Sequence, residues 1–196
     1  MKALSRVDAS ATKSDAELLA RVAEGELGAL GAVYDRHCES IRRFVARATC
    51  GHADADDLVH DAFLTAARIA ARFDGRASAR PWLIGIAARL VQRRARGLGR
   101  IPRLLARLAW TRPQALDPVD ALEARSALDR MAPAVARMTA DKRIVLLMAE
   151  LEGMTGPEIA EALEIPIGTV WTRLHHARRD VMRAIDLIPR DEAKPR

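Results

Sequence analysis

Residues 155–185 place cationic, hydroxyl and imidazole side chains at helical spacing, and such side chains could donate hydrogen bonds to an anionic polymer. Ile159 and Leu163 lie one turn apart on a first short helix, and Pro166 then interrupts the helical period. A second helix with a regular apolar stripe restarts near Gly168. The stripe consists of Val170, Leu174, Ala177, Val181 and Ile185. The segment therefore predicts two short helices joined by a tight turn.

The face opposite this stripe is polar. At about 100° per residue it presents Thr172, His175 and Arg179, with Trp171 and His176 at its edges. The second helix carries no carboxylate until its last two turns. An apolar back and a front of donors and cations favour a helix that enters the major groove of DNA. An ordinary surface pair of helices is the alternative.

Residues 53–64 are predicted to form the start of a helix that carries several acids. Capping and the helix dipole account for Asp54 and for the acids of the first turn. They do not account for Asp61, or for Phe63 and Leu64, which extend the apolar set past one core stripe. This helix could dock a partner helix, or it could bury the extra apolar side chains in its own core, and the sequence leaves both open.

Arginines recur at one-turn spacing along residues 81–96, where Arg89, Arg93 and Arg96 form a stripe on an amphipathic helix. With Trp82 and the arginines of the preceding loop, this stripe could hold a nucleic-acid backbone and stack an unpaired base. A solvated arginine face and a helix lying on a membrane surface are alternatives. The membrane alternative is weakened because the apolar side of the helix is needed for a core.

The composition favours an all-α protein with an anionic partner. Of the 196 residues, 49% are hydrophobic and only 4% are aromatic. The formal net charge is +6, which suits nucleic acid or an acidic membrane surface. No acid occurs between Asp74 and Asp117, although this span contains many arginines. They are Arg76, Arg80, Arg89, Arg93, Arg94, Arg96, Arg100, Arg103, Arg107 and Arg112.

The chain has no apolar run typical of a signal peptide or a membrane span, and it has two cysteines. We therefore expect a cytoplasmic protein without direct membrane insertion. His37, Cys38, Cys50 and His52 could be imagined as zinc ligands, although adjacent helical residues diverge; the sequence leaves any redox or metal role of the two cysteines open. Phosphate-binding, zinc-protease and serine-nucleophile motifs are missing, so we expect no enzymatic activity and no cofactor.

These segments belong to two predicted groups of helices. The first expected helix has Ser14 or Asp15 as its N-cap and ends at Gly25. The other expected helices cover about residues 29–49, 54–72, 81–96, 120–131, 133–152, 156–163 and 168–187. The expected organisation is a disordered N-terminus (1–14), an N-terminal domain (15–97), an arginine-rich linker (98–118), a helix-turn-helix domain (119–188) and a tail (189–196).

Three segments in this order resemble bacterial RNA polymerase sigma factors of the small extracytoplasmic-function group. They are the acidic segment 54–64, the segment Trp82-Leu83-Ile84-Gly85-Ile86-Ala87 and the helix-turn-helix segment 165–178. The resemblance extends over about residues 15–185. It implies an all-α chain that binds core RNA polymerase and directs promoter recognition, promoter melting and transcription initiation.

The resemblance also implies roles for the matching residues. The acidic helix of such factors docks the clamp coiled coil of the largest polymerase subunit, which here implies Asp54, Asp57, Leu58, Asp61, Phe63 and Leu64. The next loop and helix melt the minus-ten promoter element and capture a flipped base, which implies Arg76, Ser78, Trp82, Arg89, Gln92 and Arg93. The last helix reads the minus-thirty-five element, which implies Thr169, Trp171, Thr172, Arg173, His175, His176 and Arg179. The linker would occupy the RNA exit region.

A cognate anti-sigma factor is a further partner that the resemblance implies, whereas the sequence does not identify it, the stimulus, the regulon or the promoter. The alternative function is that of a helix-turn-helix repressor or a response-regulator output domain, which acts without core polymerase. The chain departs from the family at Ala88-Arg89, where Arg-Asn is frequent, and at Trp171, where Lys or Arg is frequent. Glu164 stands where Gly is frequent, and a positive φ there would cost about 1 kcal/mol.

Overall fold

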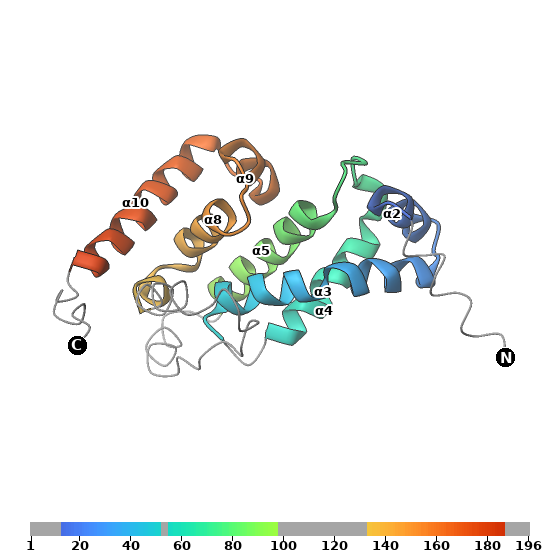
Figure 1. Ribbon diagram of the computed structural model, residues 1–196, viewed down its shortest axis with the longest axis horizontal. Helices are drawn as coiled ribbons and strands as arrows, with labels where there is room; N and C mark the ends of the chain where they lie inside the picture. The colour runs from blue at the N-terminus through green and yellow to red at the C-terminus, as the bar shows by residue number, and fades with distance from the viewer. Residues whose placement is uncertain (1–12, 52–54, 98–132, 187–196) are drawn as a thin grey trace, which may run out of the picture.

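The computed structural model describes residues 13–51, 55–97 and 133–186, and within these ranges every secondary-structure element is a helix (Figure 1). The predicted all-α class is therefore confirmed. The predicted linker, 98–118, and the predicted helix at 120–131 lie outside the described ranges, as do the predicted tail and most of the predicted N-terminal segment. No helix in the described ranges is both long and apolar enough to cross a membrane.

The N-terminal half contains α2 (Asp15–Ala23), α3 (Leu27–Thr49), α4 (Ala55–Arg68), the short 3-10 helix η1 (Ala70–Arg72) and α5 (Arg80–Gly97). The predicted N-cap of α2 is confirmed, because Ser14 Oγ accepts a hydrogen bond from Glu17 N at 3.2 Å. The Glu17 carboxylate accepts in return from Ser14 N at 2.7 Å, which completes a capping box. The helix predicted to reach residue 72 is shorter, since Ile69 leaves helical geometry at a φ of −116°.

The C-terminal half contains α8 (Ala140–Glu150), α9 (Gly156–Leu163) and α10 (Ile167–Asp186). The prediction of one helix over 133–152 is wrong, because residues 133–137 are helical and a separate helix then starts at Ala140. Thr139 has extended backbone geometry, and its side chain accepts from Lys142 N at 3.5 Å. The threonine therefore caps a new helix within an apolar period that looked continuous.

Helix α5 lies between α3 and α4 on one side and α8 and α9 on the other (Figure 1). Its buried side chains, among them Leu83 and Ile86, belong to a core that continues into Ile144 and Met148 of α8. A Cβ added to Gly85 would lie 3.0 Å from Ala162 Cβ, so α5 and α9 approach closely where α5 has no side chain. The helices of the two predicted domains thus pack on each other, while their exact boundaries stay predictions.

Arg143 of α8 strengthens the connection between the two halves. Its Nε donates to Ala48 O, near the end of α3, at 2.7 Å. Its Nη1 donates to Val135 O at 3.2 Å and to Met138 O at 3.3 Å. Burial lowers the pKa of Arg143 below its ordinary value. The carbonyls at two helix C-termini offset the free-energy cost of burying this charge, because the negative end of a helix dipole stabilises a cation.

Candidate functional site

Helix α10 has the amphipathic form that the sequence predicted. The side chains of Val170, Leu174, Ala177 and Val181 are buried, and α10 packs on α8 and α9. On the other side, Trp171, Thr172, His175 and Arg179 are exposed, while Thr169, Arg173 and His176 are half-buried. The predicted partition of α10 is confirmed for these side chains, and the side chain of Ile185 lies outside the described part.

Two residues of the predicted reading face have partners within the chain. Arg173 Nη2 lies 3.4 Å from Asp141 Oδ2, at the start of α8. Thr172 Oγ1 donates to Gly168 O at 2.8 Å, so its hydroxyl hydrogen is used one turn back along α10. In this conformation the guanidinium of Arg173 is thus partly neutralised by Asp141. His175, by contrast, is exposed at the centre of the face.

Trp171 packs on the preceding helix instead of standing free. A Cβ added to Gly156 would lie 2.5 Å from both Cζ2 and Cη2 of Trp171, so the indole covers the first residue of α9. The residue remains 50% exposed. Trp171 therefore joins the two helices of the helix-turn-helix and keeps part of its surface for a ligand.

The turn between α9 and α10 contains the expected strain. Glu164 ends α9 with a φ of 55°, in the left-handed region. Thr155 begins α9 with a capping box, in which the Glu158 carboxylate accepts from Thr155 N at 2.7 Å. This hydrogen bond from Thr155 N, followed by one from its hydroxyl, lowers the pKa of Glu158. The start of α9 is thus firmly capped, and its end depends on a residue held in an unfavourable conformation.

Helix α4 separates its acids from most of its apolar side chains. Asp57 and Asp61 are exposed, and Leu64 is 47% exposed beside them. Leu58 and Phe63 are instead buried, and the Phe63 ring packs on Tyr34 with centroids 4.7 Å apart. Both side chains belong to the core in this conformation, and their contact with polymerase stays a prediction. Asp54 lies outside the described residues.

The loop between η1 and α5 presents Arg76 and Ser78. Arg76 Nε donates to Asp74 Oδ1 at 2.8 Å, and this hydrogen bond is the main reason why the pKa of Asp74 falls to about 2. Ser78 is exposed, and its Oγ accepts from Arg80 N at 3.2 Å at the start of α5. The loop is thus held by short local hydrogen bonds at both ends.

The remaining residues predicted for the minus-ten element differ in exposure. Trp82 is half-buried, and its ring meets Phe73 edge to face with centroids 5.3 Å apart. Arg93 is exposed. Gln92 is buried, and its Nε2 has no hydrogen-bond partner among the described residues. Gln92 is thus not on an accessible surface in this conformation, and its contact with DNA stays a prediction.

Carboxylates of the C-terminal half form ion pairs with arginines of the N-terminal half. Arg76 Nη2 lies 3.2 Å from Glu161 Oε1. Arg89 Nη1 lies 2.5 Å from Glu164 Oε1, and it also donates to a backbone carbonyl of α9 at 3.1 Å. Arg80 forms a further ion pair with Glu152. These pairs could not be found from the sequence, because the partners are separated by 72 to 85 positions.

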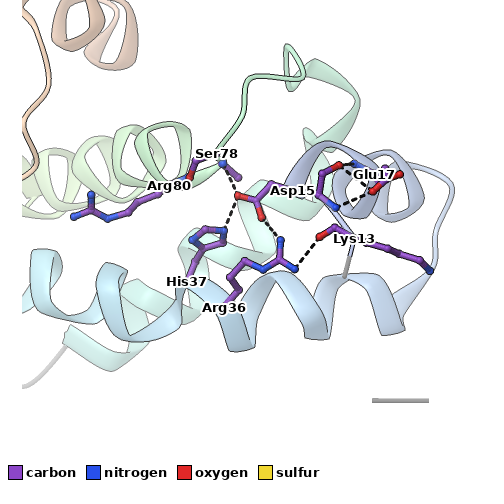
Figure 2. Close-up of polar contacts among 9 residues, drawn as sticks. Lys13, Asp15, Glu17, Arg36, His37, Ser78 and Arg80 are labelled. Carbon is purple, nitrogen blue, oxygen red and sulfur yellow. Dashed lines mark hydrogen bonds and ion pairs between the residues drawn. The ribbon is translucent and has the colours of Figure 1, made fainter. Parts of the chain in front are cut away.

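A buried polar cluster around Asp15 was missed by the sequence reasoning, which treated this residue only as a helix start (Figure 2). Asp15 is 4% exposed, and its carboxylate accepts hydrogen bonds from Arg36, from Ala79 N and, across 2.9 Å, from His37 Nε2. Burial alone would raise the pKa of Asp15, but the bonds from Ala79, Arg36 and His37 lower it overall. Nothing in local spacing indicates that residues this far apart meet.

The imagined zinc site gains no support from the described residues. His37 faces Asp15, and Cys38 Sγ instead accepts a weak contact from Arg42 at 3.8 Å. His52 lies outside the described ranges. Among the residues that are described, no group of three or more His, Cys, Asp or Glu side chains could hold a metal ion.

Comparison with protein families identifies both halves of the chain. The family described as Sigma-70 region 2 matches residues 33–101. The family described as Sigma-70, region 4 matches residues 128–181. The first match contains the acidic helix α4, the loop and α5, and the second contains α8, α9 and α10.

Relatives cover most of the chain. The ECF RNA polymerase sigma factor SigC of Mycobacterium tuberculosis is 33% identical over 175 residues, which cover 86% of this chain and 92% of SigC. SigL of the same organism is 31% identical, with 80% and 89% covered. The structure of CnrH in complex with the cytosolic domain of CnrY is similar, with a TM-score of 0.57, 26% identity, and 89% and 98% covered. The sigma factor RpoE of Bartonella quintana, in complex with the anti-sigma factor NepR, shares the fold with a TM-score of 0.58, 20% identity, and 79% and 94% covered.

Proposed function

This chain belongs to the ECF group of RNA polymerase sigma factors, and we propose that three of its surfaces divide the work of such a factor. As a sigma factor, the chain directs transcription initiation with RNA polymerase. The proposed surfaces are the acidic face of α4 for core polymerase, the loop and α5 for the minus-ten element, and the polar face of α10 for the minus-thirty-five element. The role is binding, without catalysis by this chain, and it takes place in the cytoplasm beside polymerase.

The main support for this division is that the acids of α4 are exposed, whereas its large apolar residues other than Leu64 are buried in the core. Asp57, Asp61 and the half-exposed Leu64 form a compact acidic and apolar surface. Such a surface suits a helical partner with complementary charge, since charge steers the encounter and the apolar contact adds affinity. We propose these exposed residues, together with Asp54, as the surface that first contacts polymerase.

The promoter-facing surfaces are not fully accessible in this arrangement. Arg76 and Arg89 are paired with Glu161 and Glu164 of the C-terminal half. A phosphate cannot take the place of these carboxylates while the two halves remain packed. We therefore place promoter engagement after a separation of the halves, with polymerase binding as the event that favours the separated form. Tethering both DNA contacts to one polymerase then raises their effective concentration.

A cognate anti-sigma factor is a proposed partner. The Bartonella quintana factor is described in complex with the anti-sigma factor NepR, and CnrH in complex with the cytosolic domain of CnrY. The shared fold supports the same kind of partner for this chain.

Charge reversal on α4 tests the proposed polymerase surface. We expect Asp57→Arg with Asp61→Arg to abolish promoter-directed transcription by reconstituted polymerase, because like charges would meet across the interface. Helical content by circular dichroism should stay unchanged, since both side chains are exposed. Glu24→Arg, at the exposed end of α2, is the matched control and should transcribe normally. Normal transcription by the α4 double variant would refute the polymerase-binding role of this face.

A further inference from the structure

The start of α5 is held by a carboxylate that comes from another helix (Figure 2). Asp15 Oδ2 accepts a hydrogen bond from Ala79 N at 2.7 Å, and Ala79 immediately precedes α5. Ala79 is fully buried. The first turn of α5 contains no acid of its own. Asp15 therefore supplies from α2 the negative charge that a helix N-terminus favours.

Helix α3 fixes this carboxylate from the other side. Arg36 Nη1 donates to Asp15 Oδ1 at 2.6 Å, and His37 Nε2 lies 2.9 Å from Asp15 Oδ2. About one turn further along α3, Ser40 Oγ accepts from Arg80 Nε at 2.7 Å. The last loop residue before α5 and the first residue of α5 are thus both tied to α3, one of them through Asp15.

We propose that Asp15 is a positioning residue for the promoter-melting loop, residues 73–79. This inference rests on the proposed role of that loop at the minus-ten element. The hydrogen bond to Ala79 N fixes the loop end directly after Ser78, and the pair of Asp74 with Arg76 holds the other end. Asp15 does not touch DNA itself; it holds the backbone from which Arg76 and Ser78 extend.

Packing alone does not account for a buried carboxylate at position 15. Taking a charge out of water costs free energy, and an apolar side chain of similar size stabilises a core without that cost. The carboxylate adds directional hydrogen bonds to Ala79, Arg36 and His37, which an apolar residue cannot make. The geometry thus points to placement of the loop as the purpose of Asp15.

The substitution Asp15→Asn separates positioning from packing. Asparagine has the same shape, but one of its two terminal atoms is a donor and cannot accept a hydrogen bond. Whichever way the amide is oriented, either Arg36 or the pair of Ala79 and His37 loses its acceptor. Asp35→Asn makes the same chemical change at an exposed position on α3 and is the matched control.

The test is transcription by core polymerase with the full chain, on a promoter that the unaltered chain selects from a library. The measured quantity is the ratio of transcription from that promoter to transcription from the same promoter with one minus-ten base changed. We expect Asp15→Asn to lower this ratio about tenfold, the size of one lost base contact. The corresponding ratio for a minus-thirty-five base, and both ratios for Asp35→Asn, should stay unchanged.

A merely structural role of Asp15 predicts a different result. Loss of folded protein lowers transcription from all promoters by one factor and leaves the minus-ten ratio intact, and this outcome would overturn the inference. If Asp15→Asn does not fold, His37→Leu decides, because it leaves the carboxylate in place but removes the hydrogen bond that fixes Oδ2, the oxygen to which Ala79 N donates. We expect a smaller decrease of the same ratio, and an unchanged ratio would again overturn the inference. If the unaltered chain supports no promoter-directed transcript, the proposed function itself fails.

Discussion

Substitution of His175 is the most direct test of whether α10 discriminates between bases. It is exposed at the centre of the polar face, whereas Trp171 leans on Gly156 and Arg173 is paired with Asp141. We expect His175→Ala to relax the upstream preference by about tenfold at one base position, the effect of one lost base-edge contact. A promoter-library selection measures this change. Polymerase binding by the variant should match that of the unaltered chain, and an unchanged preference would remove His175 from the reading face.

Asp15 should also make stability depend on pH. The pKa of Asp15 in the folded chain is lowered, whereas the pKa of an aspartate in an unfolded chain is about 4. The stabilisation is therefore fully present above about pH 4 and is lost as the pH falls through the lowered pKa of the folded state. Urea unfolding should show that Asp15→Asn costs about 1–3 kcal/mol at neutral pH and less in acid. An equal cost at both pH values would contradict the role of the ionised carboxylate.

Residue-scale prediction from the sequence succeeded where the cause was local. The N-cap of Ser14, with Glu17 in the first turn, follows from neighbours in the chain. The sequence left open whether Leu58 and Phe63 lie in the core, because a helical wheel does not show how wide a face the neighbouring helices cover. Their burial depends on the tertiary packing of α4, including the contact of Phe63 with Tyr34.

At the scale of elements, the helix-turn-helix depends on close packing between α9 and α10. We expect Gly156→Ala to destabilise the chain by about 1–3 kcal/mol, because its Cβ would overlap the Trp171 ring. Gly168→Ala is the matched control, since a Cβ there meets nothing within 4 Å and alanine favours the helix. Thermal unfolding measures both variants. Equal stability of the two would show that Trp171 does not pack on α9 in solution.

The periodicity of apolar residues predicted the existence of most elements but not all of their ends. Helices α9 and α10 lie within one residue of the expected bounds. The interruption at Thr139 was missed because apolar residues continue at helical spacing across it. A capping threonine followed by an acid in the first turn was the available signal, and the apolar period outweighed it.

At the scale of the whole molecule, ion pairs connect the two packed halves. We expect Glu161→Gln with Glu164→Gln to strengthen binding of the free chain to single-stranded minus-ten DNA several-fold, because Arg76 and Arg89 lose their carboxylate partners in the C-terminal half. Partly exposed ion pairs contribute about 0–1 kcal/mol each, which sets this modest size. Fluorescence anisotropy with a labelled oligonucleotide measures the affinity.

Glu150→Gln is the control for this prediction, because it breaks an ion pair with Arg178 inside the C-terminal half. It should leave binding to the minus-ten oligonucleotide unchanged. Raised ionic strength should narrow the difference between the double variant and the unaltered chain, since it screens the pairs. Equal affinities of the double variant and the control at low salt would contradict the blocking role of the two glutamates.

The sequence predicted the two groups of helices but not how they pack together. The arginine stripe on α5 was interpreted as a free surface, whereas Arg89 lies against α9. Contacts between elements far apart in the chain leave no periodic signal in the sequence. The sequence therefore does not show that Gly85 allows α5 to approach Ala162 of α9. The interfaces with polymerase and DNA were accessible from the sequence only through resemblance to a family.

The most direct measurement is transcription by purified core polymerase on a promoter library, with and without this chain. We predict that the chain produces transcripts with discrete starts, and that the productive templates share one upstream and one downstream element at fixed spacing. Transcripts that are the same in number and start position with and without the chain would contradict its role as a sigma factor.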